Sequence, residues 1–324
     1  MSRWNRLVAG CVGLLLFGAA VDRQAVRAEE AVEERRPRVE LGIGAWISSG
    51  ETKWAHDASS IPGLGNPTSK LTYKDVGTNV VDVVGKFWVT PRIFGRLNIG
   101  GAGIGGGRLI DDDYASGQRL ISSTTSDIQG ENMWYLNADV GGRVKEFANH
   151  RGYVELFAGY RYWHTEHQAV GVGRLVCDPS FFNCTAPLPP AGQTVITNTA
   201  NWHSIRIGGS TEYRMTRRFS LLGTVAVSPI SIIDNKDIHH LRSDLKQNPS
   251  LSMVGYGFGA DADVGARLMI VRNFYLNVGY RVWWNRTVDG HVTFHDATGS
   301  SQEFPLTEFQ SFRHGLTFGL NYAF

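Results

Sequence analysis

The chain of 324 residues has very little cysteine, with three residues at positions 11, 177 and 184. This scarcity excludes a small domain held together by many disulfides. No group of Cys and His has the spacing of metal ligands, so we expect no structural metal. Cys177 and Cys184 lie close together in a stretch rich in Pro and Phe. In an oxidising compartment they are expected to form one loop disulfide.

The sequence also lacks a long apolar run beyond its first segment. Residues 1–28 combine Arg3 and Arg6, an apolar stretch over 8–21 and a cleavage-like Val26-Arg27-Ala28, which predicts a signal peptide. No later stretch reaches the roughly 18 apolar residues of a membrane helix. A secreted chain without a helical span is either a soluble periplasmic or extracellular protein or a β-barrel.

An excess of one charge is missing as well. The chain has 32 Lys and Arg against 30 Asp and Glu. Removing residues 1–28 takes away four Arg and one Asp, which leaves 28 basic against 29 acidic residues. Because a nucleic-acid-binding surface needs a basic excess, we expect no nucleic-acid partner.

The sequence has instead a clear period of two, most plainly at its end. Seven apolar, aromatic or His side chains occupy the even positions from Phe312 to Phe324, and the odd positions are small or polar. Such alternation predicts a strand with unlike faces. A soluble sheet could bury the apolar face. A C-terminal Phe in a chain with a secretory leader favours an outer-membrane barrel, whose apolar face contacts lipid. We expect the barrel assembly machinery to recognise the last strand, which ends at Phe324.

The same alternation recurs along the chain and fixes the predicted fold class. We predict an all-β, ten-stranded antiparallel up-and-down transmembrane β-barrel over residues 38–324, preceded by a short periplasmic lead-in at 29–37. Short turns alternate with long polar loops, which is the outer-membrane pattern of periplasmic turns and outer loops. The predicted strands cover 38–49, 71–89, 93–110, 131–147, 151–168, 201–216, 219–235, 251–270, 273–289 and 306–324.

Charged residues of both signs fall on the inward face of these strands. Because a barrel of eight to ten strands is barely wider than its side chains, we expect them to pair and fill the lumen as a structural plug. A narrow conducting channel is the alternative reading. The inward candidates are Asp82, Lys86, Asp139, Arg143, Glu155, Arg161, Asp261, Asp263, Arg267, Arg281 and Arg313.

Two polar motifs stand where predicted strands meet outer loops. Asp111 and Asp113 are two residues apart, as are Asp237 and His239, so each pair projects from one face of an extended chain. A carboxylate beside an imidazole makes a better general base, and two close carboxylates can share a proton and hold a water. Together they could activate water for peptide hydrolysis. A loop calcium site on the three consecutive Asp at 111–113 and plain solvated loop tips are the alternatives.

The chain resembles the omptins, ten-stranded outer-membrane barrels that are proteases. The likeness rests on Asp111-Asp112-Asp113-Tyr114, on Asp237-Ile238-His239, and on the segments 41–53, 69–74, 284–286 and 319–324. It implies that Asp237 and His239 activate water and that Asp111 and Asp113 form the opposing pair. It implies no cofactor, although lipopolysaccharide can be required for activity.

Three departures from the omptin pattern are visible. Omptins that cut between basic residues carry acidic side chains at two pocket positions, where this chain has Trp54 and Asn235, although Asp234 could substitute. Of the omptin lipopolysaccharide cluster, only Tyr160 and Arg214 match. The loop at 169–200 resembles an insertion that could cover the site.

Two functions therefore stand side by side. The first is an outer-membrane aspartyl-type endopeptidase of omptin-like fold, with its active face extracellular and with peptides or proteins outside the cell as substrates. The second is a non-enzymatic barrel of the same fold, with a structural, adhesive or binding role.

Overall fold

The computed structural model describes residues 38–147 and 151–324. The expected signal peptide and the lead-in at 29–37 lie outside the described residues. In the described parts of the chain no helix is long and apolar enough to cross a membrane. The strands are β1 (Val39–His56), β2 (Ser69–Trp88), β3 (Ile93–Ala115), β4 (Arg119–Ile128), β5 (Asn132–Glu146), β6 (Gly152–Cys177), β7 (Thr194–Arg214), β8 (Phe219–His239), β9 (Leu251–Val271), β10 (Phe274–His295) and β11 (Ser301–Ala323).

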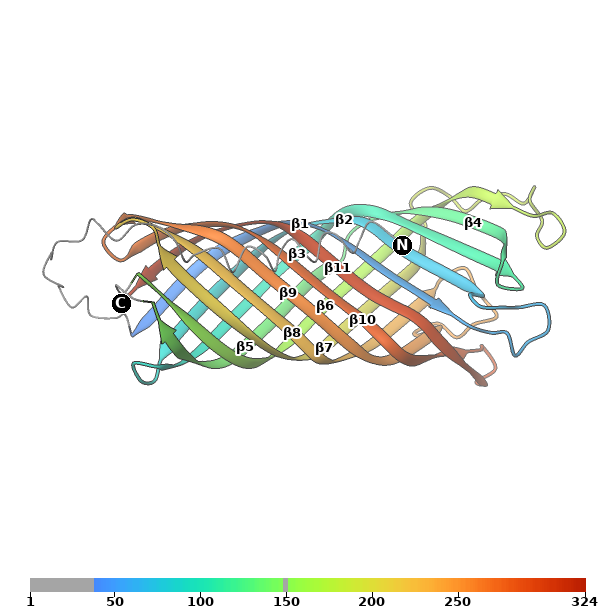
Figure 1. Cartoon of the computed structure of the whole chain (residues 1–324). Helices are drawn as coiled ribbons and strands as arrows, with labels where there is room; N and C mark the ends of the chain where they lie inside the picture. Colours follow the sequence, from blue (N-terminus) through green and yellow to red (C-terminus); the bar gives the residue numbers. More distant parts are fainter. Residues whose placement is uncertain (1–37, 148–150) are drawn as a thin grey trace, which may run out of the picture. The chain divides into compact units, whose positions relative to one another are not determined.

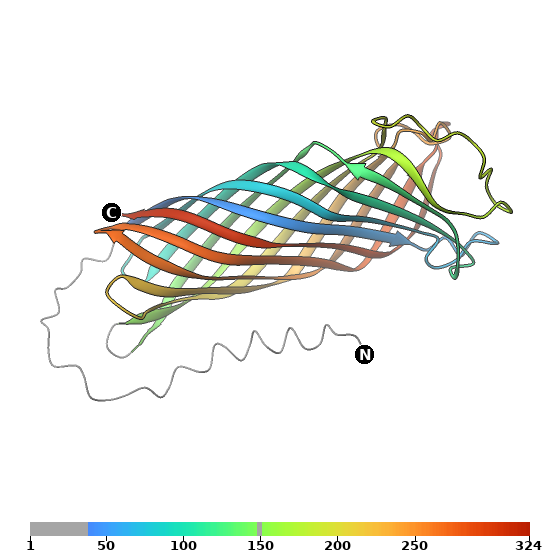
Figure 2. The same ribbon diagram turned by 90° about the horizontal axis from the view of Figure 1, so that it is seen from above.

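These strands close into one antiparallel barrel. Apart from β4 and β5, which do not pair with one another, each strand pairs with its neighbours in the chain, and β1 closes the ring by pairing with β11. β4 and β5 share one position in the wall, since β4 pairs with β3 and β6 near the loop end and β5 pairs with the same two strands further down. Figures 1 and 2 show β4 at the end of the barrel opposite the C-terminus. The predicted ring of ten is therefore confirmed.

The strands run further into the outer loops than the sequence predicts. The segment 111–130 was expected to be a loop, yet it contains the end of β3 and all of β4. The strands β6 and β7 likewise extend into the expected loop at 169–200. Beyond the lipid both faces of a strand can be polar, so the alternation that marks a strand fades while the backbone pairing continues.

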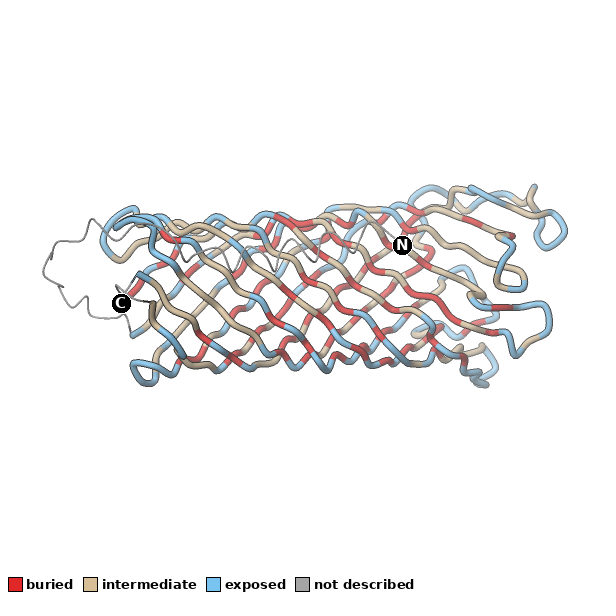
Figure 3. Tube along the Cα trace, viewed as in Figure 1, coloured by how far each residue is buried: buried red, intermediate tan, exposed pale blue. Residues whose placement is uncertain are grey.

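The outer face of the barrel carries an apolar belt, as a lipid-facing surface requires. Along each strand exposed and buried residues alternate, as Figure 3 shows. The exposed members stop well short of the loop end; on β8 the last of them is Ile232. Belt residues include Leu41, Ile43, Val81, Val83, Leu97, Ile99, Val140, Leu156, Ile207, Val225, Val227, Val264, Val278, Leu316 and Leu320.

Most of the predicted inward charges pair in the lumen, whereas Arg313 donates to Ser48, Thr78 and the carbonyl of Val76. Arg281 lies 2.6 Å from Asp263 and 3.2 Å from Asp82. Further down, Arg267 lies 2.6 Å from Glu40. Other pairs join Arg161 and Arg206 to Asp261, Arg96 to Asp139 and Lys86 to Glu155.

A layer of aromatic rings closes the lumen on the loop side of this charge network. Trp283 packs against Trp46 at 4.9 Å and against Tyr135 at 4.8 Å between ring centroids. Trp163 joins them at 5.7 Å. All four side chains are buried. We call the loop end above this layer the barrel mouth.

Candidate active site

The barrel mouth brings the two predicted motifs to the same height. Asp111 and Asp113 lie on β3, and Asp237 and His239 lie at the end of β8. On β8 the side chains of Asn235 and Asp237 are buried in the interior. Asp237 follows Ile232, the last belt residue of β8, by five positions, so the site stands beyond the lipid-facing belt.

Asp237 and His239, which we call the dyad, lie close together but do not form a hydrogen bond. His239 Nε2 lies 3.6 Å from Asp237 Oδ2. Asp237 is 0% exposed, and neither of its carboxylate oxygens has a hydrogen-bond partner among the described residues. Catalytic hydrogen bonds are often long in an unliganded enzyme and shorten when substrate binds. The contact therefore fits a base and its orienting carboxylate.

The neighbouring start of β9 holds the backbone of the dyad. The backbone amide of His239 donates to Ser250 Oγ at 3.0 Å, and the amide of Ser250 donates to the carbonyl of Asp237 at 2.9 Å. These two bonds fix the two residues relative to one another. Pairing of β8 with β9 ends at Asp237, so these bonds continue the support on that side, while β7 still pairs with His239.

Mutual effects on pKa show that the two motifs converge. Burial, then the charges of Asp113 and Asp237, raise the pKa of Asp111 to about 7, while nearby His239 opposes the rise. Burial also raises the pKa of Asp113, against a hydrogen bond from Ser69. For His239 burial lowers the pKa, but the carboxylates of Asp237 and Asp111 outweigh it and the net pKa is raised. The four predicted residues thus form one electrostatic unit.

The calcium alternative for residues 111–113 does not fit this geometry. Asp112 projects to the opposite face of β3, where it accepts a hydrogen bond from Ser123 at 2.6 Å. The three carboxylates therefore do not converge. Within residues 38–147 and 151–324, no group of three or more His, Cys, Asp or Glu is arranged to hold a metal ion.

Two aromatic residues below the carboxylates were not singled out from the sequence. Tyr73 on β2 is 0% exposed, and its ring stacks on His167 of β6 with centroids 5.1 Å apart. Both residues occupy inward positions in the alternation of their strands. The sequence alternation could have identified both residues as inward-facing. The stacking contact between them depends on the closure of the barrel.

The three expected specificity residues divide between the two faces of the wall. Trp54 is 1% exposed and Asn235 is 0% exposed, so both face the interior. Asn235 is held by Asn198 and by the carbonyl of Thr199, which accepts its side-chain amide at 2.9 Å. Asp234 is exposed on the outer face of β8. The idea that Asp234 substitutes in the pocket is therefore wrong, because successive residues of a strand face opposite sides.

The two expected lipopolysaccharide residues lie far apart. Tyr160 is on the outer wall, where its hydroxyl is 2.6 Å from His203 Nδ1, and its neighbour on β7 is Ile205. Arg214 ends β7, nine residues further toward the turn end of the barrel. At about 3.3 Å per residue this separation is roughly 30 Å. The structure therefore does not bring Tyr160 and Arg214 together in one cluster, as the expected lipopolysaccharide site requires.

The expected disulfide is present in the structure. Cys177 ends β6 and is bonded to Cys184 in the following loop. Arg174 donates to the carbonyl of Cys184 and, at 3.2 Å, to the carbonyl of Ala186. These contacts tie the Pro-rich segment to the wall of the barrel near β4 and β6.

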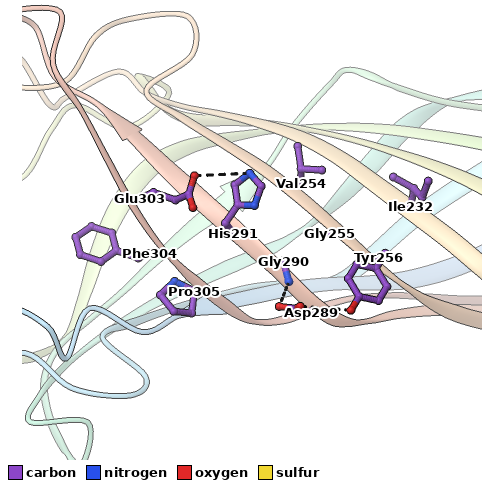
Figure 4. Close-up of a pocket in the computed structure, with 10 residues that line it drawn as sticks. All are labelled: Ile232, Val254, Gly255, Tyr256, Asp289, Gly290, His291, Glu303, Phe304 and Pro305. Carbon is purple, nitrogen blue, oxygen red and sulfur yellow. Dashed lines mark hydrogen bonds and ion pairs between the residues drawn. The ribbon is translucent and has the colours of Figure 1, made fainter.

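A separate hollow lies on the outer wall. Its volume is about 530 Å³, and it is lined from β8 to β11 (Figure 4). Inside it His291 Nε2 is 3.9 Å from Glu303, and the hydroxyl of Tyr256 is 3.4 Å from Asp289. None of the four residues of the candidate site lines this hollow.

Comparison with known proteins supports the fold. No protein-family model and no curated protein matches this sequence. The structure is similar to the outer membrane protease OmpT from Escherichia coli, with a TM-score of 0.73 and 17% identity over 88% of this chain and 96% of OmpT. The translocator domain of the autotransporter NalP from Neisseria meningitidis reaches a TM-score of only 0.36, at 9% identity over 99% of this chain and 95% of that one. At 17% identity the likeness to OmpT concerns the fold alone: the chain has the same barrel architecture as OmpT.

Proposed function

We propose that this protein is an endopeptidase of the bacterial outer membrane, with its active face toward the cell exterior. The observation that carries the proposal is the buried Asp237 beside His239, facing Asp111 and Asp113 across the barrel mouth. The apolar belt supports the membrane location. The likeness to OmpT, a protease by name, supports the reaction class.

The chemistry follows from the charges of the four residues. A water held between the two pairs attacks the peptide carbonyl carbon, and His239 takes its proton. Asp237 stabilises the imidazolium that forms. His239 then returns the proton to the leaving amine nitrogen, so the peptide bond breaks. Asp111 and Asp113 hold this water from the side opposite His239, and the raised pKa of Asp111 lets the two carboxylates share one proton near neutral pH.

The interior positions near the candidate site favour an uncharged substrate side chain, since Asn235 precedes Asp237 by two residues and Trp54 pairs with Leu71, the partner of Asp111. Trp54 and Asn235 carry no charge, and both are buried. His56 packs beside Trp54, with ring centroids 6.0 Å apart, and burial lowers the pKa of His56 to about 4, which keeps it neutral. A basic side chain entering this region would lose its hydration without a matching carboxylate. We therefore propose apolar or aromatic residues next to the cleaved bond.

A peptide library tests the proposal directly. The refolded chain is incubated with mixed peptides, with and without lipopolysaccharide, and the products are identified by mass spectrometry. Cleavage should be lost in His239→Ala. The matched control is His240→Ala, because His240 contacts Thr197 at 3.0 Å on the other face of the strand end. A folded barrel that cuts no peptide under either condition would favour the non-enzymatic alternative.

A further inference from the structure

Tyr73 carries a buried hydroxyl that the fold itself does not use. The side chain is 0% exposed, yet its hydroxyl has no hydrogen-bond partner among residues 38–147 and 151–324. A buried polar group without a partner costs about 1–3 kcal/mol. Such a group in a native fold calls for an explanation, and binding of a ligand is one.

The register of β2 and β3 places Tyr73 directly beside the candidate site. Leu71 pairs with Asp111, and Tyr73 pairs with Leu109. All four side chains share the inward face, so Tyr73 and Asp111 are diagonal neighbours, about 7–8 Å apart between Cα atoms. Asp237, from the opposite wall, is near enough to act on the same phenol. The hydroxyl therefore lies below the space between the two motifs.

The ring of Tyr73 is held in place from a third strand. It stacks on His167 of β6 with an interplanar angle of 19°. A stacked, fully buried ring has little freedom, so the direction of its hydroxyl is fixed before substrate arrives. Burial, and then the charges of Asp237 and Asp111, raise the pKa of Tyr73 well above its ordinary value, so the phenol keeps its proton.

The proposed reaction needs a donor of this kind. When water attacks a peptide carbonyl, the carbonyl oxygen becomes negative, and a preorganised hydrogen-bond donor stabilises that charge. Arg242 also acts on Asp113 and His239 electrostatically, but its guanidinium is bound by both oxygens of Asp244, at 2.8 and 2.6 Å. A neutral phenol has the further advantage that it does not form an ion pair with the site carboxylates.

We propose that Tyr73 is a catalytic residue whose hydroxyl donates a hydrogen bond to the oxyanion of the tetrahedral intermediate. The inference rests on the proposed peptidase function and adds a fifth residue to it. The phenol donates a hydrogen bond in this step and keeps its proton. The bond strengthens as negative charge develops on the carbonyl oxygen and weakens when the carbonyl re-forms.

The test is Tyr73→Phe, which removes only the hydroxyl. Loss of one oxyanion donor lowers kcat by roughly 10²–10³-fold in enzymes of known mechanism. We expect a loss of that size with little change in KM, and an equal loss of affinity for a peptide phosphonate that mimics the intermediate. The control is Tyr256→Phe, which removes an exposed hydroxyl on the outer wall. Replacement of Tyr73 by a fluorotyrosine, which keeps the hydroxyl, should preserve cleavage.

Three results would overturn the inference. Unchanged kcat in Tyr73→Phe would show that the hydroxyl is idle. A shift in the pH midpoint of kcat, with the maximal rate retained, would show that Tyr73 only tunes Asp111. If the parent barrel cleaves nothing while its electrophoretic mobility and strand content show it folded, the peptidase function fails and this inference fails with it. If the parent barrel cleaves peptides and Tyr73→Phe cleaves them equally well, only the role of Tyr73 fails and the peptidase function stands.

Discussion

Ser250 accepts a hydrogen bond from the amide of His239 at 3.0 Å while its own amide donates to the carbonyl of Asp237 at 2.9 Å. One residue, directly before β9, thus holds the backbone of both members of the dyad. Only the first of these bonds uses the serine side chain, so a substitution removes one bond and leaves the other.

The first prediction concerns Ser250→Ala. Loss of one neutral hydrogen bond costs about 0.5–1.5 kcal/mol, and a loosened His239 should lower kcat by up to roughly tenfold. The rate of peptide cleavage measures this loss. Ser252→Ala is the matched control, because Ser252 bonds His295 at 2.9 Å instead. Equal rates in Ser250→Ala and the parent would contradict the support we assign to Ser250.

The second prediction concerns the pH dependence of cleavage. His239 acts as a base only when neutral, and its pKa is raised above the ordinary 6.5 by Asp237 and Asp111 against the effect of burial. The rate should therefore fall on acidification with a midpoint above 6.5, by about tenfold per pH unit below it. In Asp111→Asn the midpoint for His239, followed by NMR titration, should move down. A midpoint below 6.5 in the parent would be inconsistent with the assigned base.

The third prediction is that Asp111→Asn stabilises the barrel while it inactivates the enzyme. Asp111 has a pKa of about 7 in the fold against 3.8 ordinarily, so its ionisation opposes folding increasingly from pH 4 to pH 7 and fully above. The neutral Asn avoids this cost, which is at most about 4 kcal/mol at 1.36 kcal/mol per pKa unit. The melting temperature should rise at pH 8 and remain unchanged at pH 4. Asp112→Asn should show no such rise.

The fourth prediction concerns specificity. Asn235→Asp places a carboxylate on the interior face two residues before Asp237. It should raise cleavage next to Lys or Arg by tenfold or more relative to cleavage next to apolar residues, because a charge pair in a desolvated site is worth at least about 1.4 kcal/mol. The ratio of the two products measures this. Asp234→Asn, on the outer face, should leave the ratio unchanged.

The fifth prediction concerns the charged lumen. Arg281 is within 3.2 Å of both Asp82 and the hydroxyl of Tyr135, and it also pairs with Asp263. Arg281→Met should destabilise the barrel by about 3 kcal/mol, because it leaves Asp82 buried with the Tyr135 hydroxyl but without its charged partner. Urea unfolding in lipid gives the difference, and Arg286→Met on the exposed face is the control. Adding Asp82→Asn should recover part of the loss.

The sequence predicts the ring and the site pairs because both depend on local rules. Alternation by two assigns faces strand by strand, and residues two apart share a face wherever the chain is extended. That rule predicted that Asp111 shares a face with Asp113, and that Asp237 shares a face with His239. The same rule, applied to β8, would also have placed Asp234 outside.

Other features depend on the closed barrel and were out of reach. The stack of Tyr73 on His167 joins β2 to β6, and their relative height is set by the stagger of the strands between them. β4 was missed because above the lipid its two faces are both polar, so no alternation marks it.

The contact between Glu40 and Arg267 has a consequence for assembly. The two residues are 227 positions apart, and Glu40 also accepts a hydrogen bond from Asn321 near the end of the chain. Arg267 thus gains its β1 partner only after nearly the whole chain has emerged and the first strand meets the last. Contacts between residues so far apart in sequence form late, because the entropy cost of closing the long intervening loop comes first, and they slow folding. A barrel without its last strand would leave Glu40 without the Asn321 bond and this part of the charge network incomplete.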